Sequence, residues 1–303
     1  MAWLHENREE FLNAVLYAAE INKLNPVVVE KDYYVTLILR GLKEELPFIV
    51  FKGGTSLSKC HKVIKRFSED IDVTIDIKLT QGQMGKVKDA IKAVACSLGL
   101  AILNINETCS RRSYNKYLLA YETVLEDSDS GLRPVVILET SFSEVSFPTV
   151  VIPVRSYLGD MLQAEEPEMV GKFSLSSFEM KVQGLDRTLI DKVFAICDYY
   201  LKGDVRRHSR HVYDIYKLLP LVAQTEAFKD LVKEVRSVRA MTNICPSAQP
   251  GVDVPELLNN LIENEIYKDD YDSITSRILE EDVRYETAII AVKRLADSGM
   301  FKE

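Results

Sequence analysis

The spacing of apolar residues predicts alternating helices and strands in the first half of the chain. Apolar residues recur at helical spacing over residues 7–22, and a second helical pattern runs from about 28 to 42, ending near Gly41. Alternating apolar and polar residues predict a half-buried strand over 71–77. Shorter patterns predict strands at 48–51, 100–106, 115–124, 134–142 and 149–152, and helices at 55–61 and 83–98. Residues 127–133 form the expected hairpin loop between two of these strands.

The pattern changes to a helical one after about residue 165. Asp186 is placed to cap a helix that reaches about residue 201, and further helices are expected at 208–219 and within 226–300. A loop at 246–254, which contains proline and glycine, interrupts the last segment. The predicted fold class is therefore α+β, with a mixed sheet and flanking helices in residues 1–165 and a helical bundle domain in residues 166–303.

Composition and charge narrow the class of protein. The chain has 303 residues, of which 47% are hydrophobic, and a formal net charge of -8. This charge excludes a protein that binds nucleic acid by its overall electrostatics alone. The cysteine count is odd and the spacing irregular, so neither a disulfide framework nor a zinc site is predicted. The sequence has neither an apolar run of membrane-spanning length nor a signal-peptide pattern, so we expect a cytoplasmic protein with no membrane partner.

Two short segments are basic despite the overall charge. Residues 52–66 contain five basic residues and no acidic one, and residues 206–211 contain three arginines and two histidines. A solvated face is the ordinary interpretation of such a segment. The first segment gains interest because an acidic pair follows it directly.

Asp70 and Asp72 form this acidic pair. Side chains two positions apart on a strand point to the same face, so the two carboxylates should project together. Like charges this close repel each other unless a cation lies between them. Hard oxygen ligands suit Mg²⁺, with Mn²⁺ as an alternative, and support phosphoryl or nucleotidyl transfer by a two-metal mechanism. An isolated Asp-x-Asp is often only the polar face of a strand.

A glycine pair lies between the first predicted strand and the acidic pair. Gly53 and Gly54 allow backbone N–H groups to approach an anion closely, and a helix that begins at Thr55 would add its free N–H groups. Binding of a phosphate group is therefore expected at this turn. Glu139 follows a continuous apolar run, as in a buried central strand, and is the best candidate for a third carboxylate. A solvated glutamate at a strand end is nearly as good an interpretation.

Together these residues resemble the DNA-polymerase-β-like nucleotidyltransferases, and among them the AbiEii/AbiGii-type toxins. In that branch a Lys-Gly-Gly-Thr-x-Leu segment precedes Arg-x-Ser-x-Asp-x-Asp, and this chain has matching segments at 52–57 and 66–72. Residues 30–35, 191–195 and 210–215 resemble further motifs of the same branch. His211 replaces the first aspartate of an Arg-Asp-x-x-Asp-Leu motif, so only Arg210 and Asp214 carry over.

The resemblance implies a toxin of a toxin–antitoxin or abortive-infection system, with a separate antitoxin protein as partner. It implies transfer from a nucleoside triphosphate, with Mg²⁺, to RNA; some members act on the acceptor end of tRNA. Asp214 is then a base that deprotonates an attacking hydroxyl, or else forms an intrahelical ion pair with Arg210 or Lys217. The expected site has Asp70, Asp72, Lys192 and Asp214 as catalytic residues, Asp70, Asp72 and Glu139 as metal ligands, and Lys52, Gly53, Gly54, Thr55, Ser56, Arg66 and Ser68 as nucleotide-binding residues.

Other functions remain open at this point. The same core could transfer a nucleotide to a protein side chain, or a degenerate core could bind nucleotide or RNA and act through a partner. A glycosyltransferase would need a nucleotide-binding α/β region before the Asp-x-Asp, and only one short strand closely precedes it here. Several rings could contact RNA, although core packing or structural hydrogen bonding is the commoner role: Tyr33, Tyr34, Tyr199, Tyr200, His208 and His211.

Overall fold

The computed structural model describes residues 2–68, 70–75, 77, 79–109, 112–126, 133–142 and 148–302. Contacts group the described residues into two compact units. The first comprises those within Met1–Cys60, Glu69–Glu144 and Val150–Val182, and the second those within His61–Ser68, Val145–Thr149 and Gln183–Glu303. The expected division at residue 165 assigns the last helix and strand of the first unit to the helical part. A division into two folding domains at that residue stays a prediction.

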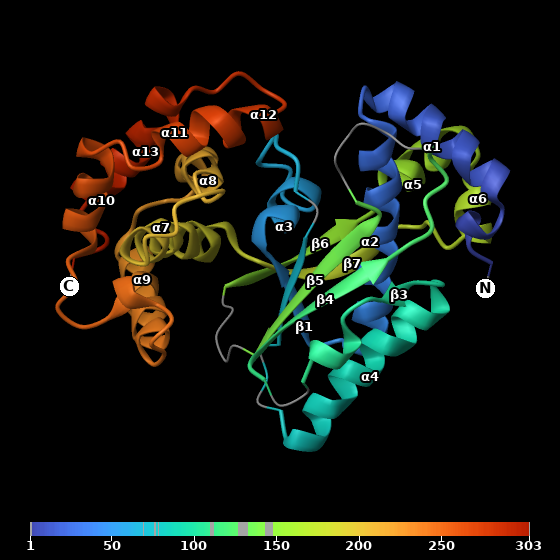
Figure 1. The fold of residues 1–303 in the computed structure, drawn as a ribbon, viewed down its shortest axis with the longest axis horizontal. Helices are drawn as coiled ribbons and strands as arrows, with labels where there is room; N and C mark the ends of the chain where they lie inside the picture. The colour runs from blue at the N-terminus through green and yellow to red at the C-terminus, as the bar shows by residue number, and fades with distance from the viewer. Residues whose placement is uncertain are drawn as a thin grey trace. The chain divides into compact units, whose positions relative to one another are not determined.

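The first unit is built on a mixed sheet, which confirms the α+β prediction. Seven strands in the described part of the chain lie in the order β3-β4-β5-β2-β1-β7-β6 (Figure 1). The β2–β5 and β1–β7 pairs are parallel, and the β1–β2, β3–β4 and β4–β5 pairs are antiparallel. The strands are β1 (Ile49–Lys52), β2 (Ile71–Ile75), β3 (Ala101–Ile102), β4 (Tyr114–Ala120), β5 (Val135–Phe142), β6 (Thr149–Val154) and β7 (Phe178–Gln183).

The first four helices of this unit lie close to where the pattern predicted them, whereas the helices at 157–165 and 167–172 were not predicted. Asn25 caps α2 through a hydrogen bond that its side chain accepts from the Val27 N–H. The expected end near Gly41 is wrong. Gly41 continues the helix and lies against α4, where a Cβ atom would come within 2.9 Å of Val94 Cγ1. The helices are α1 (Arg8–Asn22), α2 (Pro26–Glu45), α3 (Gly53–Lys59), α4 (Gln81–Ser97), α5 (Tyr157–Glu165) and α6 (Pro167–Lys172).

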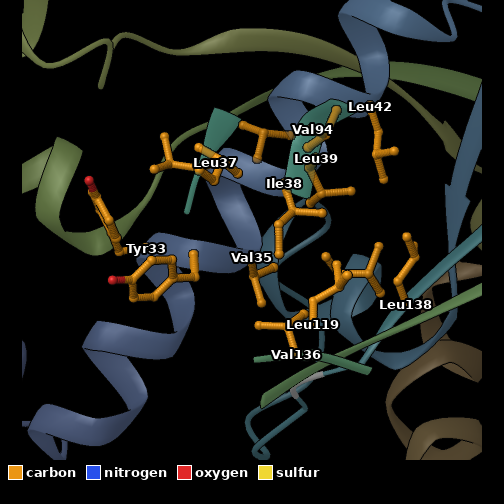
Figure 2. Packing of buried hydrophobic residues seen from close by; sticks show 14 of the residues in the cluster. Tyr33, Val35, Leu37, Ile38, Leu39, Leu42, Val94, Leu119, Val136 and Leu138 are labelled. Carbon is orange, nitrogen blue, oxygen red and sulfur yellow. The ribbon is translucent and has the colours of Figure 1, made fainter. Parts of the chain in front are cut away.

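One face of the sheet is covered by α2 and α4. Leu119, Val136 and Leu138 are buried and lie in one hydrophobic core with Ile38 and Val94 of these helices (Figure 2). Removing each such side chain from water stabilises the fold by about 1.5–3 kcal/mol. Alternate residues of β4 and β5 are less buried and point to the other face. The apolar face thus holds the strands in a fixed register, and the opposite face carries the charged residues of β4 and β5.

The second unit is helical in its described residues after Gln183, as predicted. Helix α8 packs against α7 and α13, and α10 packs against α13. Its first helix is capped by Gly184 instead of Asp186, which lies inside the first turn. The elements are α7 (Leu185–Leu201), α8 (Arg210–Leu218), α9 (Glu226–Ala240), α10 (Val254–Glu263), α11 (Lys268–Asp270), a π-helix (Tyr271–Thr275), α12 (Ser276–Ile278) and α13 (Tyr285–Asp297).

Some sequence predictions differ from the structure. The expected strand at 100–106 contains only β3, followed by a 3₁₀ turn over Ile105–Glu107. Strand β6 passes through Pro153, which is tolerated because β6 is at the edge of the sheet. Strand β7 was not predicted. The antiparallel pairing of β4 with β5 is confirmed, whereas residues 127–132 of the expected hairpin loop lie outside the described residues. Over the described residues, no helix has both the length and the hydropathy that crossing a membrane requires.

Candidate functional site

Charged side chains form a row across four neighbouring strands of the first unit. Lys52 of β1 is the register partner of Asp72 of β2, and Asp72 is the register partner of Glu139 of β5. Glu139 is in turn opposite Lys116 of β4. Register partners on adjacent strands point to the same face of a sheet. Two carboxylates therefore lie side by side with a lysine at each end, on the face that α2 and α4 do not cover.

Gly53 places the turn after β1 directly against Asp72. Its backbone has φ +81°, and a Cβ atom added there would lie 2.7 Å from Asp72 Cγ and would overlap Oδ2. Only glycine adopts this conformation readily and leaves this space. The glycine turn and Asp72 of the acidic pair, which belong to separate motifs in the sequence, are thus in direct contact.

The remaining residues of the turn are directed inward. Gly54, Thr55 and Ser56 are buried. Ser56 Oγ donates a hydrogen bond to the Gly53 carbonyl oxygen at 2.9 Å. The Ser56 hydroxyl therefore shapes the turn. Lys52 lies at the start of the turn and is only partly buried. It is the one basic residue among residues 52–56, and its side chain is long and flexible.

The charges of all three expected metal ligands act on the phenol of Tyr114. Burial raises the pKa of Tyr114, and the charges of Glu139, Asp72 and Asp70 raise it further. Across the described residues, no group of three or more His, Cys, Asp or Glu side chains is close enough to hold a metal ion. The donor chemistry of the adjacent Asp72 and Glu139 carboxylates nevertheless fits Mg²⁺, which takes hard oxygen ligands from one or two carboxylates together with substrate phosphates.

A second cluster of charged residues is buried in the second unit. Arg66 donates from Nε to Asp214 Oδ1 at 2.7 Å and from Nη2 to Oδ2 at 2.9 Å. Lys192 Nζ lies 2.8 Å from Asp214 Oδ2. The Asp214 side chain has no exposed surface, and the Arg66 side chain is 2% exposed. This bidentate geometry fixes both the orientation of the Arg66 guanidinium and its distance from the Asp214 carboxylate.

The electrostatics of this cluster bear on the predicted role of Asp214. Burial alone would raise its pKa, but the charges of Arg66 and Lys192 hold the pKa of Asp214 well below its usual range. Burial lowers the pKa of Lys192, whereas Asp214 raises it. A buried carboxylate of such low pKa is a poor acceptor for a substrate proton, so the electrostatics do not support Asp214 as a general base. The alternative pair with Lys217 is wrong, because Lys217 Nζ lies 2.8 Å from Glu281.

Backbone contacts tie the segment that carries Arg66 into the second unit. Arg66 forms a β-bridge with Leu279, and Phe67 N donates to the Ile278 carbonyl oxygen at 3.0 Å. Lys65 N donates to the Tyr213 hydroxyl at 2.9 Å. Since Arg66 Nη1 also donates to the Phe67 carbonyl oxygen, each of the three guanidinium nitrogens is engaged. The segment at 65–67 is therefore anchored to the second unit through both its backbone and the Arg66 side chain.

Most of the tyrosines and histidines that could contact RNA pack against other residues of the protein. Tyr33 and Tyr34 are buried and pack with Phe11 in the core of the first unit. Tyr199 stacks on His208 with ring centroids 3.3 Å apart. Burial lowers the pKa of His208, and burial with the charge of Lys192 lowers the pKa of His211 to about 3. Both imidazoles are therefore neutral at pH 7 and offer no positive charge to a phosphate.

Sequence reasoning did not select Tyr114 and Lys116. They alternate on β4 with buried residues, which in the sequence indicates only the polar face of an ordinary strand. The useful signal was the hairpin itself, because pairing the two predicted strands brings Lys116 opposite Glu139. The acidic residues of the motif at 30–35 are structural: Glu30 accepts from Val124 N at 2.8 Å, and Asp32 pairs with Lys59.

Comparison with known proteins gives one family match. The family model described as the nucleotidyl transferase AbiEii toxin of a type IV toxin–antitoxin system matches residues 37–291. No curated protein matches the chain significantly. Among solved structures, MenT4, a nucleotidyltransferase toxin from Mycobacterium tuberculosis H37Rv, is similar with a TM-score of 0.48 and 14% sequence identity, over 97% of this chain and 88% of that one.

Proposed function

Because the chain belongs to the AbiEii nucleotidyltransferase toxin family of type IV toxin–antitoxin systems, we propose that it transfers a nucleotide from a nucleoside triphosphate to RNA, with tRNA as the acceptor and Mg²⁺ as the metal. The observation that carries the proposal is the row of Lys52, Asp72 and Glu139 on adjacent strands, with Gly53 against Asp72. The glycine turn, to which we assign phosphate binding, thereby lies against the carboxylate of Asp72, a hard oxygen donor of the kind that this chemistry requires.

In the proposed reaction an acceptor hydroxyl attacks the α-phosphorus of the triphosphate. The new P–O bond forms as the α–β phosphoanhydride breaks, pyrophosphate leaves with the electron pair, and the proton of the hydroxyl passes to solvent water. Lys52 and the backbone at Gly53 would bind the phosphate groups, and Asp70, Asp72 and Glu139 would hold the Mg²⁺. The metal ion would neutralise charge on the triphosphate and on the leaving group.

Lys192 and Asp214 are proposed to support the reaction as a buried unit. Asp214 holds the side chains of Arg66 and Lys192 in fixed positions through contacts of 2.7–2.9 Å. Arg66 lies four residues before Asp70 in the chain, so its anchoring limits the freedom of the segment that leads to the metal ligands. We assign Asp214 a positioning role in place of the proton acceptor that the sequence suggested.

The choice of RNA as acceptor is supported by the resemblance of residues 30–219 to the toxin branch, some of whose members act on tRNA. A cognate antitoxin follows from the family. A cytoplasmic location is proposed because both tRNA and nucleoside triphosphates are abundant there. Transfer to a protein side chain is the competing reaction and would use the same phosphate-binding residues.

The test is transfer of label from α-phosphate-labelled nucleoside triphosphates to total RNA or total protein, with Mg²⁺ present. We expect RNase to release the label and protease to leave it. Asp72→Asn should abolish labelling, whereas the exposed Asp230→Asn should not change it. Labelling by Asp72→Asn at the parental rate would refute the site, and release of label by protease would refute the acceptor.

A further inference from the structure

The face of the sheet that carries the carboxylates continues onto β4, where two exposed side chains have no assigned role. Tyr114 and Lys116 are alternate residues of this strand and point to the same face as Glu139. We infer that Tyr114 and Lys116 bind the nucleoside triphosphate, with Lys116 contacting phosphate oxygens and the Tyr114 ring stacking on the base. This inference rests on the proposed function and names two further residues of the same site.

Lys116 is placed to bind an anion next to the carboxylates. Its Nζ lies 3.7 Å from Glu139 Oε1, and the Lys116 side chain is 46% exposed. An ion pair that is this open to solvent contributes little to stability, about 0–1 kcal/mol. The lysine is therefore free to exchange Glu139 for a phosphate oxygen at small cost. With Lys52 at the opposite end of the row, two cations flank the position where a triphosphate would meet Asp72 and Glu139.

Tyr114 presents a large ring beside the same carboxylates. It is the register partner of Ser141, two residues along β5 from Glu139, so the two side chains lie on the same face of the sheet. Tyr114 is 49% exposed. An aromatic side chain with this much exposed surface offers a ring on which any nucleobase can stack.

A nucleotide explains both residues better than an RNA backbone does. An RNA strand would be expected to follow a longer stripe of basic residues. On β4 the basic group is the single residue Lys116, and the next outward-facing residues, Leu118 and Ala120, carry no charge. One cation and one ring within a few residues match one triphosphate and one base.

The test measures equilibrium binding of α,β-methylene analogues of ATP, GTP, CTP and UTP, with Mg²⁺, to the full chain. Lys116→Met and Tyr114→Ala should each weaken binding of the preferred analogue about tenfold. Lys116→Arg and Tyr114→Phe should keep most of the affinity of the unsubstituted protein, because the first keeps the charge and the second keeps the ring. The matched controls are Lys92→Met on the exposed side of α4 and Tyr17→Ala on α1, where Tyr17 is 45% exposed.

The outcomes of this test distinguish failure of this inference from failure of the proposed function on which it rests. If the unsubstituted protein binds none of the four analogues, the proposed function and the inference fail together. If it binds one of them and both β4 variants bind as the controls do, only the inference fails. If the variants instead lose affinity for tRNA while keeping that for the analogue, the residues contact the acceptor and the inference is overturned. Thermal unfolding midpoints equal to those of the controls would show that the variants are folded.

Discussion

Gly53 lies so close to the carboxylate of Asp72 that no side chain fits between them. A Cβ atom at residue 53 would lie 3.0 Å from Asp72 Cβ and 2.7 Å from Cγ, and would overlap Oδ2. The backbone of Gly53 also has φ +81°, in the region that L-residues rarely adopt. The turn after β1 and the carboxylate on β2 therefore cannot change independently, and the glycine determines where Asp72 points.

Replacing Gly53 with alanine should abolish most of the transfer activity. The added methyl group must displace the Asp72 carboxylate, and a displacement of about 1 Å at a reacting centre costs about 100-fold in rate. Initial rates of label transfer and the thermal unfolding midpoint measure the two consequences. The matched control is Gly203→Ala, which has a similar φ of +68° but whose added Cβ would meet nothing within 4 Å. Equal activity in the two variants would contradict this role of Gly53.

Replacing Glu139 with glutamine should raise the Mg²⁺ concentration that supports half-maximal transfer by about tenfold or more. The substitution keeps the shape of the side chain but removes one of two adjacent negative charges on the sheet face. A Mg²⁺ titration of the transfer rate, after treatment with a chelator, measures this shift, and Mn²⁺ should also restore activity. Glu122→Gln, whose side chain is 93% exposed, is the control. An unchanged titration for Glu139→Gln would exclude Glu139 as a ligand.

The sequence predicted the local features of this site better than its long-range pairings. The two strand candidates with a loop between them correctly predicted the antiparallel pairing of β4 with β5, and the apolar run before Glu139 correctly predicted a strand inside the sheet. The parallel register that makes Glu139 the neighbour of Asp72 could not be read from the sequence, because parallel strands are paired by packing and not by a connecting turn. Strand β7 was not predicted, because a strand this short between helices gives only a weak alternation of apolar and polar residues.

The Arg66–Asp214 pair shows the same limit more strongly. The two residues are 148 positions apart, and the sequence offered nearer partners for Asp214 on its own helix. Resemblance to a family marked both residues without indicating that they touch. Only tertiary packing, which buries the carboxylate completely, selects the distant arginine over the local lysine.

Replacing Asp214 with asparagine should destabilise the protein by about 3–5 kcal/mol, because Arg66 and Lys192 would remain buried without a counter-charge. Denaturant unfolding of the full chain measures the loss. Asp230→Asn removes one partner of an exposed pair with Lys233 and should change the free energy of unfolding by less than about 1 kcal/mol. A small and equal effect of the two substitutions would mean that the buried cluster contributes little to stability.

His211 should make stability fall as the solution becomes acidic. Burial, with the charge of Lys192, lowers its pKa from 6.5 to about 3. Between these values the unfolded chain binds a proton at this position and the folded chain does not. The stability from neutral His211 is thus fully present above pH 6.5 and is lost as the pH falls toward 3, with a slope of up to about 1.4 kcal/mol per pH unit.

The His211→Gln variant isolates this contribution, because glutamine retains polar atoms but does not titrate. Free energies of unfolding measured between pH 6.5 and 4.5 should decline less steeply in this variant than in the parent protein. Asp214 stays ionised throughout this interval in the folded state, since its pKa is held well below the usual range. Parallel curves for the two proteins would show that His211 takes up a proton in the folded state as readily as in the unfolded one. The buried environment assigned to it would then be wrong.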